Sequence, residues 1–247
     1  MGTILENTAY EMSMAVTCYD VDRYNRLKIS ALMKLHQEVG ERHITAFGIT
    51  SEELRNIYDI AFIFTRVRIK IHRLPKAEER ITVRTWCSEL KGVRFMRNYQ
   101  LISENGEMLT ESKGEVAAIK LSDRSIVRPR DQEAFNCFLY NFDLDNSCEK
   151  PSKLSVLHDG GSWFKRPVRF SDLDYNGHMN NTVYADVVFD HLPKEALQKP
   201  VTEFQINFLN EALVGETVLV GVNQTESGYE VSGCVGEKHC FSSKVSY

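Results

Sequence analysis

The sequence lacks the cysteine spacing that is typical of zinc sites and of small disulfide-bonded domains. Its six cysteines are scattered along 247 residues, and no two of them form a Cys-x-x-Cys pair. Such a distribution fits neither a structural zinc site nor a disulfide framework. We therefore expect reduced, mostly buried thiols, no bound metal and a cytoplasmic protein.

Long apolar runs and a strong excess of one charge are also missing. No stretch of about 18 apolar residues occurs, and the N-terminus has no cationic segment leading into an apolar one, so neither membrane insertion nor a signal peptide is expected. The net charge of -4 favours neither a nucleic acid nor a membrane surface as partner. The 43% of hydrophobic residues can form the core of one large domain or of two smaller ones.

Basic residues are concentrated in one region of the chain. Residues 55–97 hold eleven Lys or Arg against four Asp or Glu, whereas residues 151–247 hold eight against twelve. Within the basic region, residues 66–72 alternate strictly between basic or titratable and apolar side chains, which predicts a strand with one buried face. An acidic partner can bind the other face, although a solvated sheet face is the competing interpretation. The candidate partner-binding residues are Arg66, Arg68, Lys70, Arg94 and Arg97.

The first half of the chain predicts one long helix followed by strands. Apolar side chains recur with helical period from Ile29 to Val39, and Thr50 with Glu53 forms a capping-box pattern for a second, short helix. Strands are expected from residue 60 to 72 and over residues 80–88, 94–104 and 111–121, with an Asn-Gly turn signal at 105–106.

The second half repeats this pattern. The sequence Asp-Leu-Asp-Tyr-Asn at 172–176 echoes Asp-Val-Asp-Arg-Tyr-Asn at 20–25, and an apolar helix follows each loop. Because a helix that is apolar nearly all round must be enclosed, the repeat predicts an α+β tandem (double) hot-dog fold, with two antiparallel sheets each wrapped round a long helix. We expect an N-terminal domain at 1–121, a linker at 122–161 and a C-terminal domain at 162–247. The duplication permits a monomer, and a homodimer is the alternative.

The loop before the second helix concentrates the polar side chains. Asp172-x-Asp174-x-Asn176-Gly177 matches the start of a calcium loop, but the twelfth position is Val183, which argues against calcium. An Asx-rich turn with a helix cap is the simplest interpretation. A hydrolytic site is the third, because side chains at 174, 176 and 178 share one side of an extended loop.

Several motifs resemble those of the acyl-acyl carrier protein thioesterases of the plant and bacterial type. The string Asp174-x-Asn176-x-His178-x-Asn180-Asn181 is similar to that family's Asp-x-Asn-x-His-x-Asn-Asn stretch. Met-Arg-Asn-Tyr at 96–99 resembles its Met-Arg-Arg-Asp-Trp segment, His-Arg-Leu-Pro at 72–75 its Asp-Arg-Tyr-Pro segment, and Phe-Leu-Asn-Glu at 208–211 its Tyr-Arg-Arg-Glu-Cys segment. One departure is Ala212, which stands where plant members carry a cysteine.

The resemblance implies hydrolysis of a fatty acyl-acyl carrier protein thioester, without a cofactor. The implied catalytic residues are Asp174, Asn176, His178 and Glu211. With alanine at 212, attack by water activated by Glu211 is expected, with His178 and Asn176 positioning water and thioester and Asp174 orienting them. N–H groups around Gly177, Asn180 and Asn181 at the helix start are expected to stabilise the oxyanion. In the first half, Arg26 or Leu27 stands where His178 has its counterpart.

The same resemblance implies a tunnel for the acyl chain and a protein partner. The candidate tunnel residues are Ile29, Leu32, Met33, Phe64 and Trp86, for which plain core packing is the alternative. The expected partner is acyl carrier protein bearing an acyl-phosphopantetheine group. An acyl-coenzyme A thioesterase and a non-catalytic acyl-binding protein remain alternatives. A dehydratase is disfavoured because its helix-borne acid and histidine have only Asp190 and His191 as candidates, near the helix end.

Overall fold

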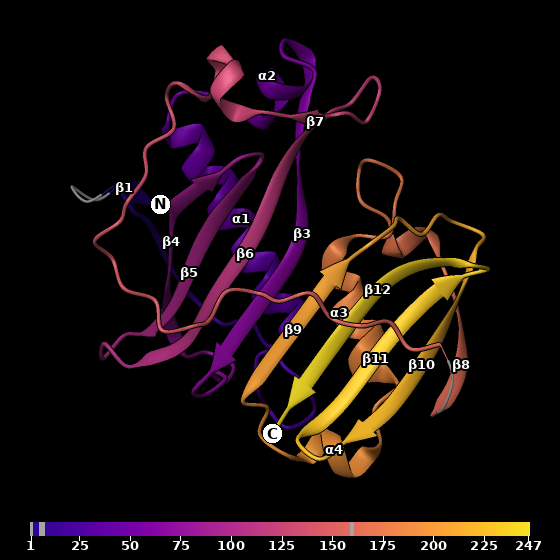
Figure 1. The fold of residues 1–247 in the computed structure, drawn as a ribbon. Helices are drawn as coiled ribbons and strands as arrows, with labels where there is room; N and C mark the ends of the chain where they lie inside the picture. The colour runs from indigo at the N-terminus through magenta and orange to yellow at the C-terminus, as the bar shows by residue number, and fades with distance from the viewer. Residues whose placement is uncertain (1, 5–7, 159–160) are drawn as a thin grey trace.

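The protein folds as two similar halves joined by a long connection (Figure 1). The computed structural model describes residues 2–4, 8–158 and 161–247. The elements of the N-terminal half are β1 (Thr3–Ile4), β2 (Tyr10–Ala15), α1 (Ile29–Ala46), α2 (Ser51–Asn56), β3 (Ile60–Ile71), β4 (Arg80–Lys91), β5 (Arg94–Ser103) and β6 (Met108–Lys120). Those of the connection are β7 (Ile126–Val127) and the 3-10 turns η1 (Pro129–Asp131) and η2 (Glu133–Phe135). Those of the C-terminal half are β8 (Ser162–Pro167), η3 (Phe170–Asp172), α3 (Asn181–Asp190), α4 (Lys194–Gln198), β9 (Glu203–Phe208), β10 (Thr217–Thr225), β11 (Gly228–Val235) and β12 (Lys238–Ser246).

The strands of both halves form one continuous antiparallel sheet over the described residues. Its order is β1-β2-β4-β5-β6-β3-β9-β12-β11-β10-β8, with β7 paired to β6. The two halves join where β3 pairs with β9, Val67 opposite Ile206 and Ile69 opposite Phe204. The predicted hot-dog architecture is confirmed, but the two expected sheets share backbone hydrogen bonds at their common edge.

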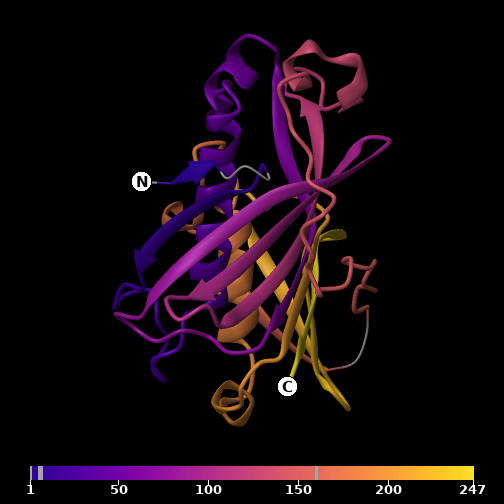
Figure 2. The same ribbon diagram turned by 90° about the vertical axis from the view of Figure 1, so that its left-hand side faces the viewer.

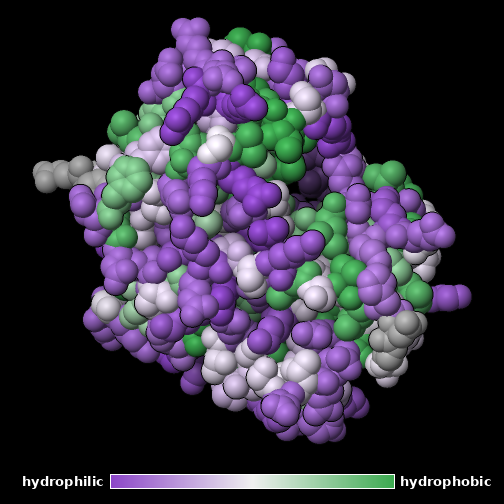
Figure 3. All heavy atoms as spheres, in the orientation of Figure 1, coloured by the Kyte–Doolittle hydropathy of each residue, from purple (hydrophilic) through white to green (hydrophobic). Residues whose placement is uncertain are grey.

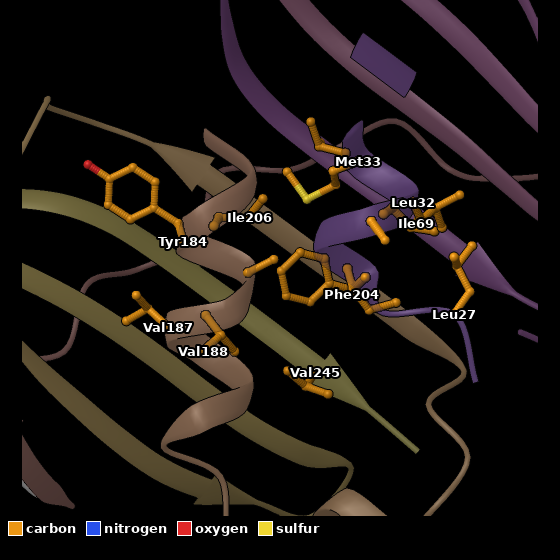
Figure 4. Close-up of a cluster of buried hydrophobic side chains, with 14 of the residues drawn as sticks. Leu27, Leu32, Met33, Ile69, Tyr184, Val187, Val188, Phe204, Ile206 and Val245 are labelled. Atoms are coloured by element: carbon orange, nitrogen blue, oxygen red, sulfur yellow. The ribbon is translucent and has the colours of Figure 1, made fainter. Parts of the chain in front are cut away.

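Both long helices lie on the same side of this sheet (Figures 1 and 2). On β3, Val67, Ile69 and Ile71 are buried as the alternation predicts. Figure 4 shows Phe204 of β9 between α1, which carries Leu32 and Met33, and α3, which carries Val188. Each fully buried aliphatic or aromatic side chain contributes roughly 1.5–3 kcal/mol relative to exposure. One buried cluster therefore contains side chains of both halves.

The predicted loop repeat is present in three dimensions. In the first half the Asp22 N–H donates to the Arg26 carbonyl at 2.8 Å, and in the second the Asp174 N–H donates to the His178 carbonyl at 2.9 Å. Both turns contain a residue with positive φ, Asn25 at 57° and Gly177 at 81°. This equivalence identifies Arg26 as the counterpart of His178, so the first half lacks the histidine.

The connection is more structured than the predicted linker at 122–161. Its start belongs to the N-terminal half, because β7 pairs with β6 and Phe135 and Phe138 are buried there. It then crosses the outer face of the sheet in front of β6, β3 and β9 (Figure 1), where Asn146 donates to the Ser112 carbonyl at 3.0 Å. Residues 159–160 lie outside the described residues.

Candidate active site

The loop between η3 and α3 is held as a tight turn by Asp174. One carboxylate oxygen accepts the Asn176 N–H at 2.8 Å and the His178 N–H at 3.4 Å, and the other accepts the Asn176 side-chain amide at 3.3 Å. Gly177 occupies the left-handed conformation that the turn requires, which costs least for a residue without a Cβ. The sequence placed Asp174 behind Asn176 and His178, and the structure brings these three together.

A second acidic residue anchors the base of this loop. The Asp172 carboxylate pairs with Arg166, with 2.7 Å between Nη2 and Oδ1, and accepts the Arg169 N–H at 2.7 Å. The Arg166 guanidinium holds the pKa of the Asp172 carboxyl below its usual value. The role of Asp172 is to fix the loop in place.

The structure brings the Glu211 carboxylate against the imidazole of His178. Their Oε2 and Nε2 atoms are 3.1 Å apart, with side-chain exposures of 46% for Glu211 and 20% for His178. The Met179 N–H donates to the Ala212 carbonyl at 2.9 Å, which joins the loop to the segment after β9. Main-chain bonding therefore positions the pair, at an open edge of the molecule.

Two arginines bind the polar side chains of this site: Arg55 of the N-terminal half and Arg124 of the connection. Arg55 of α2 donates to the side-chain oxygen of Asn176 at 2.8 Å and stacks over Tyr175 at 4.9 Å. Arg124 donates to Glu211 Oε1 at 2.9 Å. They lie 121 and 87 positions away along the chain, and no local pattern distinguishes them from other surface arginines. Sequence reasoning missed both.

The predicted oxyanion donors need correction. The N–H groups of Gly177, Met179 and Asn180 donate to the carbonyls of Asp174, Ala212 and Asp172, and the N–H of His178 faces the Asp174 carboxylate. Asn180 acts as the helix cap, since its side-chain oxygen accepts the Thr182 N–H at 2.9 Å. Among the three predicted donors, all of which lie in the described part of the chain, only Asn181 makes no hydrogen bond through its N–H or its side-chain amide. It lies at the first position of α3 and lines the cavity.

A cavity of about 1490 Å³ opens beside this cluster. Figure 3 shows the molecule hollowed between the end of the N-terminal half that carries β7 and the C-terminal half. Asp174, Asn176, His178 and Glu211 line its C-terminal side. The apolar lining comes mainly from the N-terminal half, from residues including Ile44, Leu54, Phe62, Phe95, Val116 and Phe138.

The predicted tunnel residues lie mostly elsewhere. Phe64 lines the cavity, and Met33 lines only a small hollow next to it. Ile29, Leu32 and Trp86 are buried in the core at exposures of 4%, 0% and 0% and do not line the cavity. The helix period identifies the buried face of α1 but cannot separate the part that meets the sheet from the part that meets the cavity.

The predicted basic face is not a free docking surface. Arg68 pairs with Glu203 and Glu149 at 2.6 and 2.7 Å, and Lys70 donates to Ser147 of the crossing connection at 2.8 Å. The carboxylate oxygens of Glu115 lie 3.7 Å from Arg66 Nη1 and 3.3 Å from Arg94 Nη1. The side chain of Arg97 points inward and is buried. The charges were identified correctly, but acidic residues distant in sequence neutralise this face and the connection covers part of it.

Comparison with known families agrees with this architecture. The family model described as the acyl-ACP thioesterase N-terminal domain matches residues 7–132, and that described as the C-terminal domain matches residues 161–239. The chain belongs to the acyl-ACP thioesterase family. The sequence-based resemblance is thereby confirmed.

Individual members of the acyl-ACP thioesterase family are only distantly similar. The chain is 23% identical to the chloroplastic oleoyl-acyl carrier protein thioesterase of Coriandrum sativum, over 80% of this chain and 58% of that protein. It is 22% identical to the chloroplastic dodecanoyl-[acyl-carrier-protein] hydrolase of Cinnamomum camphora, over 92% and 62%. The chain therefore spans little more than half the length of these relatives.

Solved structures of acyl-ACP thioesterases share the fold almost completely. An acyl-ACP thioesterase from Bacteroides thetaiotaomicron superposes with a TM-score of 0.89 at 22% identity, covering 98% of both chains. The 12:0-ACP thioesterase from Umbellularia californica gives 0.84 at 19% identity, also covering 98% of both.

Among the described residues, no helix has the length and apolar character needed to span a membrane.

Proposed function

We propose that the protein hydrolyses the thioester of fatty acyl-acyl carrier protein, releasing free fatty acid. The observation that carries the proposal is the 3.1 Å contact between His178 and Glu211 at the edge of a large cavity with an apolar wall. Membership of the acyl-ACP thioesterase family and the names of the relatives in the previous section support the carrier-bound substrate.

The reaction needs water activation and charge stabilisation rather than a protein nucleophile. Alanine at 212 cannot attack the thioester, so the acyl carbon is attacked by water. In our proposal Glu211 accepts the proton of this water. Its carboxylate lies 3.1 Å from His178 and accepts a hydrogen bond from Arg124, and a carboxylate has further lone pairs for a water molecule. The tetrahedral intermediate then expels the pantetheine thiolate, which takes the proton from Glu211 and so restores its carboxylate.

The remaining polar groups are suited to hold the thioester oxygen. The Asn176 amide bonds Asp174 through one N–H and Arg55 through its oxygen, which leaves its second N–H free to donate. Asn181 adds unused donors at the N-terminus of α3, where the helix dipole favours negative charge. We assign Asp174 and Arg55 as positioning residues for Asn176.

The experiment is hydrolysis by Glu211→Gln and Asn176→Ala over a chain-length series of carrier-protein and coenzyme A thioesters. We expect kcat to fall by at least about 100-fold in each variant, because a lost base or oxyanion donor commonly costs that much. The melting temperature is expected to change little, because both side chains lie at the open mouth of the cavity.

Glu216→Gln is the matched control. Glu216 lies in the same turn, accepts the Leu213 N–H and pairs with Lys238 rather than with His178. It should keep wild-type turnover. Full activity in both site variants would refute the assignment, and faster hydrolysis of coenzyme A thioesters would redirect the proposal to the acyl-coenzyme A reaction.

A further inference from the structure

The wall of the cavity in the N-terminal half contains a buried cation. Arg97 of β5 is 6% exposed and lines the cavity between Phe95 and Tyr99. Its Nη1 lies 3.1 Å from His43 Nδ1 and 3.4 Å from Thr85 Oγ1. No carboxylate of the described residues forms an ion pair with it. Glu41, which lines the same cavity, is exposed and accepts the hydrogen bond of Ser51.

The titratable neighbours of Arg97 do not supply a negative charge. Burial, and secondarily the guanidinium itself, lowers the pKa of His43 to about 3, so this imidazole is neutral. Burial raises the pKa of the Cys87 thiol and that of the Tyr99 hydroxyl, so both keep their protons at neutral pH. A buried cation without a counter-charge is costly. A ligand that brings an acceptor oxygen relieves that cost.

Space for such an atom lies over Gly40 of α1. An atom at the position of a Gly40 Cβ would lie 3.6 Å from the Tyr99 hydroxyl oxygen and 4.0 Å from Arg97 Nε, at ordinary contact distances. The Tyr99 hydroxyl and His36 Nε2 are buried without hydrogen-bond partners among the described residues, and the two rings stack at 4.3 Å. We call Gly40, Arg97, Tyr99 and His36 the polar floor.

We propose that the polar floor binds an oxygen atom carried by the acyl chain, so that the protein prefers acyl groups with a hydroxyl, keto or carboxylate oxygen beyond the thioester. This inference rests on the proposed function, because it takes the cavity to hold an acyl chain. A plain hydrocarbon chain would exclude water from Arg97 and offer no acceptor in return. An oxygen substituent accepts from the guanidinium and the Tyr99 hydroxyl, and a carboxylate also balances the charge.

The test uses S-alkyl pantetheine thioethers, which carry the chain but no cleavable thioester. Plain chains are compared with chains of equal length that bear a hydroxyl, a keto group or a terminal carboxylate at successive positions, and Kd is measured calorimetrically. We expect at least one oxygenated chain to bind the wild-type protein about tenfold more tightly than the plain chain. Arg97→Met should abolish this preference, and Tyr99→Phe should reduce it.

Arg94→Met is the matched control, since Arg94 lies on the same strand but pairs with Glu115 on the outer face. It should retain the preference. Gly40→Ala favours the helix and fills the space over the polar floor, so it should weaken binding of oxygenated chains while the protein stays folded. If Arg97→Met does not fold, the binding measured with Gly40→Ala still tests the inference.

Equal affinity of the wild-type protein for plain and oxygenated chains at every position would overturn the inference. Hydrolysis of plain and oxygenated thioesters at equal rates would count against it and leave the proposed function intact. Selective binding of oxygenated thioethers by a protein that hydrolyses no thioester would support the polar floor and refute the proposed function.

Discussion

Histidines of this protein take different roles because their surroundings differ. His178 is partly exposed and lies 3.1 Å from the Glu211 carboxylate at the edge of the cavity. His36 and His43 are buried between α1 and the sheet, and burial lowers the pKa of each to about 3. Residue type alone could not distinguish these cases, because desolvation depends on the packing of distant segments.

The buried histidines predict a loss of stability in mild acid. Both are neutral in the folded protein, whereas the unfolded chain binds protons below its ordinary pKa of about 6.5. Their contribution is therefore complete above pH 6.5 and is lost as the pH falls from 6.5 toward 3, by up to about 1.4 kcal/mol per pH unit for each histidine. Urea unfolding of wild type and His36→Phe between pH 7.5 and 5 measures this slope.

The substitution His36→Phe should roughly halve the slope of the unfolding free energy against pH, because it removes one of the two buried histidines that titrate on unfolding. His158→Phe, at an exposed position, serves as the control and should keep the wild-type slope. The salt-bridged Asp172 does not interfere, because its lowered pKa places its loss of stabilisation below about pH 4. An unchanged slope in His36→Phe would contradict the assignment.

At the scale of elements, the start of α3 combines capping with site geometry. Asn180 ends the loop and satisfies the Thr182 N–H, and this places Asn181 at the cavity. The simplest sequence interpretation, a helix cap, is therefore correct for Asn180. The same turn therefore caps α3 through Asn180 and places the unused donors of Asn181 at the cavity.

The cap predicts a measurable stability change. Asn180→Ala removes the side-chain acceptor and should lower the free energy of unfolding by about 1 kcal/mol, whereas Asn180→Ser should retain most of it. Urea denaturation followed by circular dichroism compares the three proteins at pH 7.5. Equal stability of the alanine and wild-type proteins would show that the cap contributes nothing.

For the whole molecule, the decisive feature is the junction between halves. The β3–β9 pairing and the packing of α1 against α3 make a single core. The cavity depends on this junction, because Asp174, His178 and Glu211 belong to the C-terminal half whereas most of the apolar lining belongs to the N-terminal half. Separation of the halves would destroy the site as well as the sheet.

We therefore expect the two halves to unfold together. The two tryptophans report separately, since Trp86 is buried in the N-terminal half and Trp163 lies on β8. Urea unfolding of the single-tryptophan proteins Trp163→Phe and Trp86→Phe is followed by fluorescence, with circular dichroism of each variant as reference. In each variant the midpoints from fluorescence and circular dichroism should coincide. Separated midpoints would indicate that the halves unfold independently.

The sequence by itself determined the repeated helix-and-strand pattern, the buried face of β3 and the string from Asp174 to Asn181. These features depend on the local period and spacing of apolar and polar residues, because helices and strands each place side chains on one face with a characteristic period. The same local rules also identified Asn180 as a possible cap.

Only the tertiary structure decided which groups meet. It brought Glu211 to His178, added Arg55 and Arg124, neutralised the basic face and placed Arg97 inside the cavity. It also separated Leu32 and Trp86, which form core, from Phe62 and Phe95, which line the cavity. The physical reason is that contacts between residues far apart in the chain depend on how the whole sheet curves and joins, which no local pattern encodes.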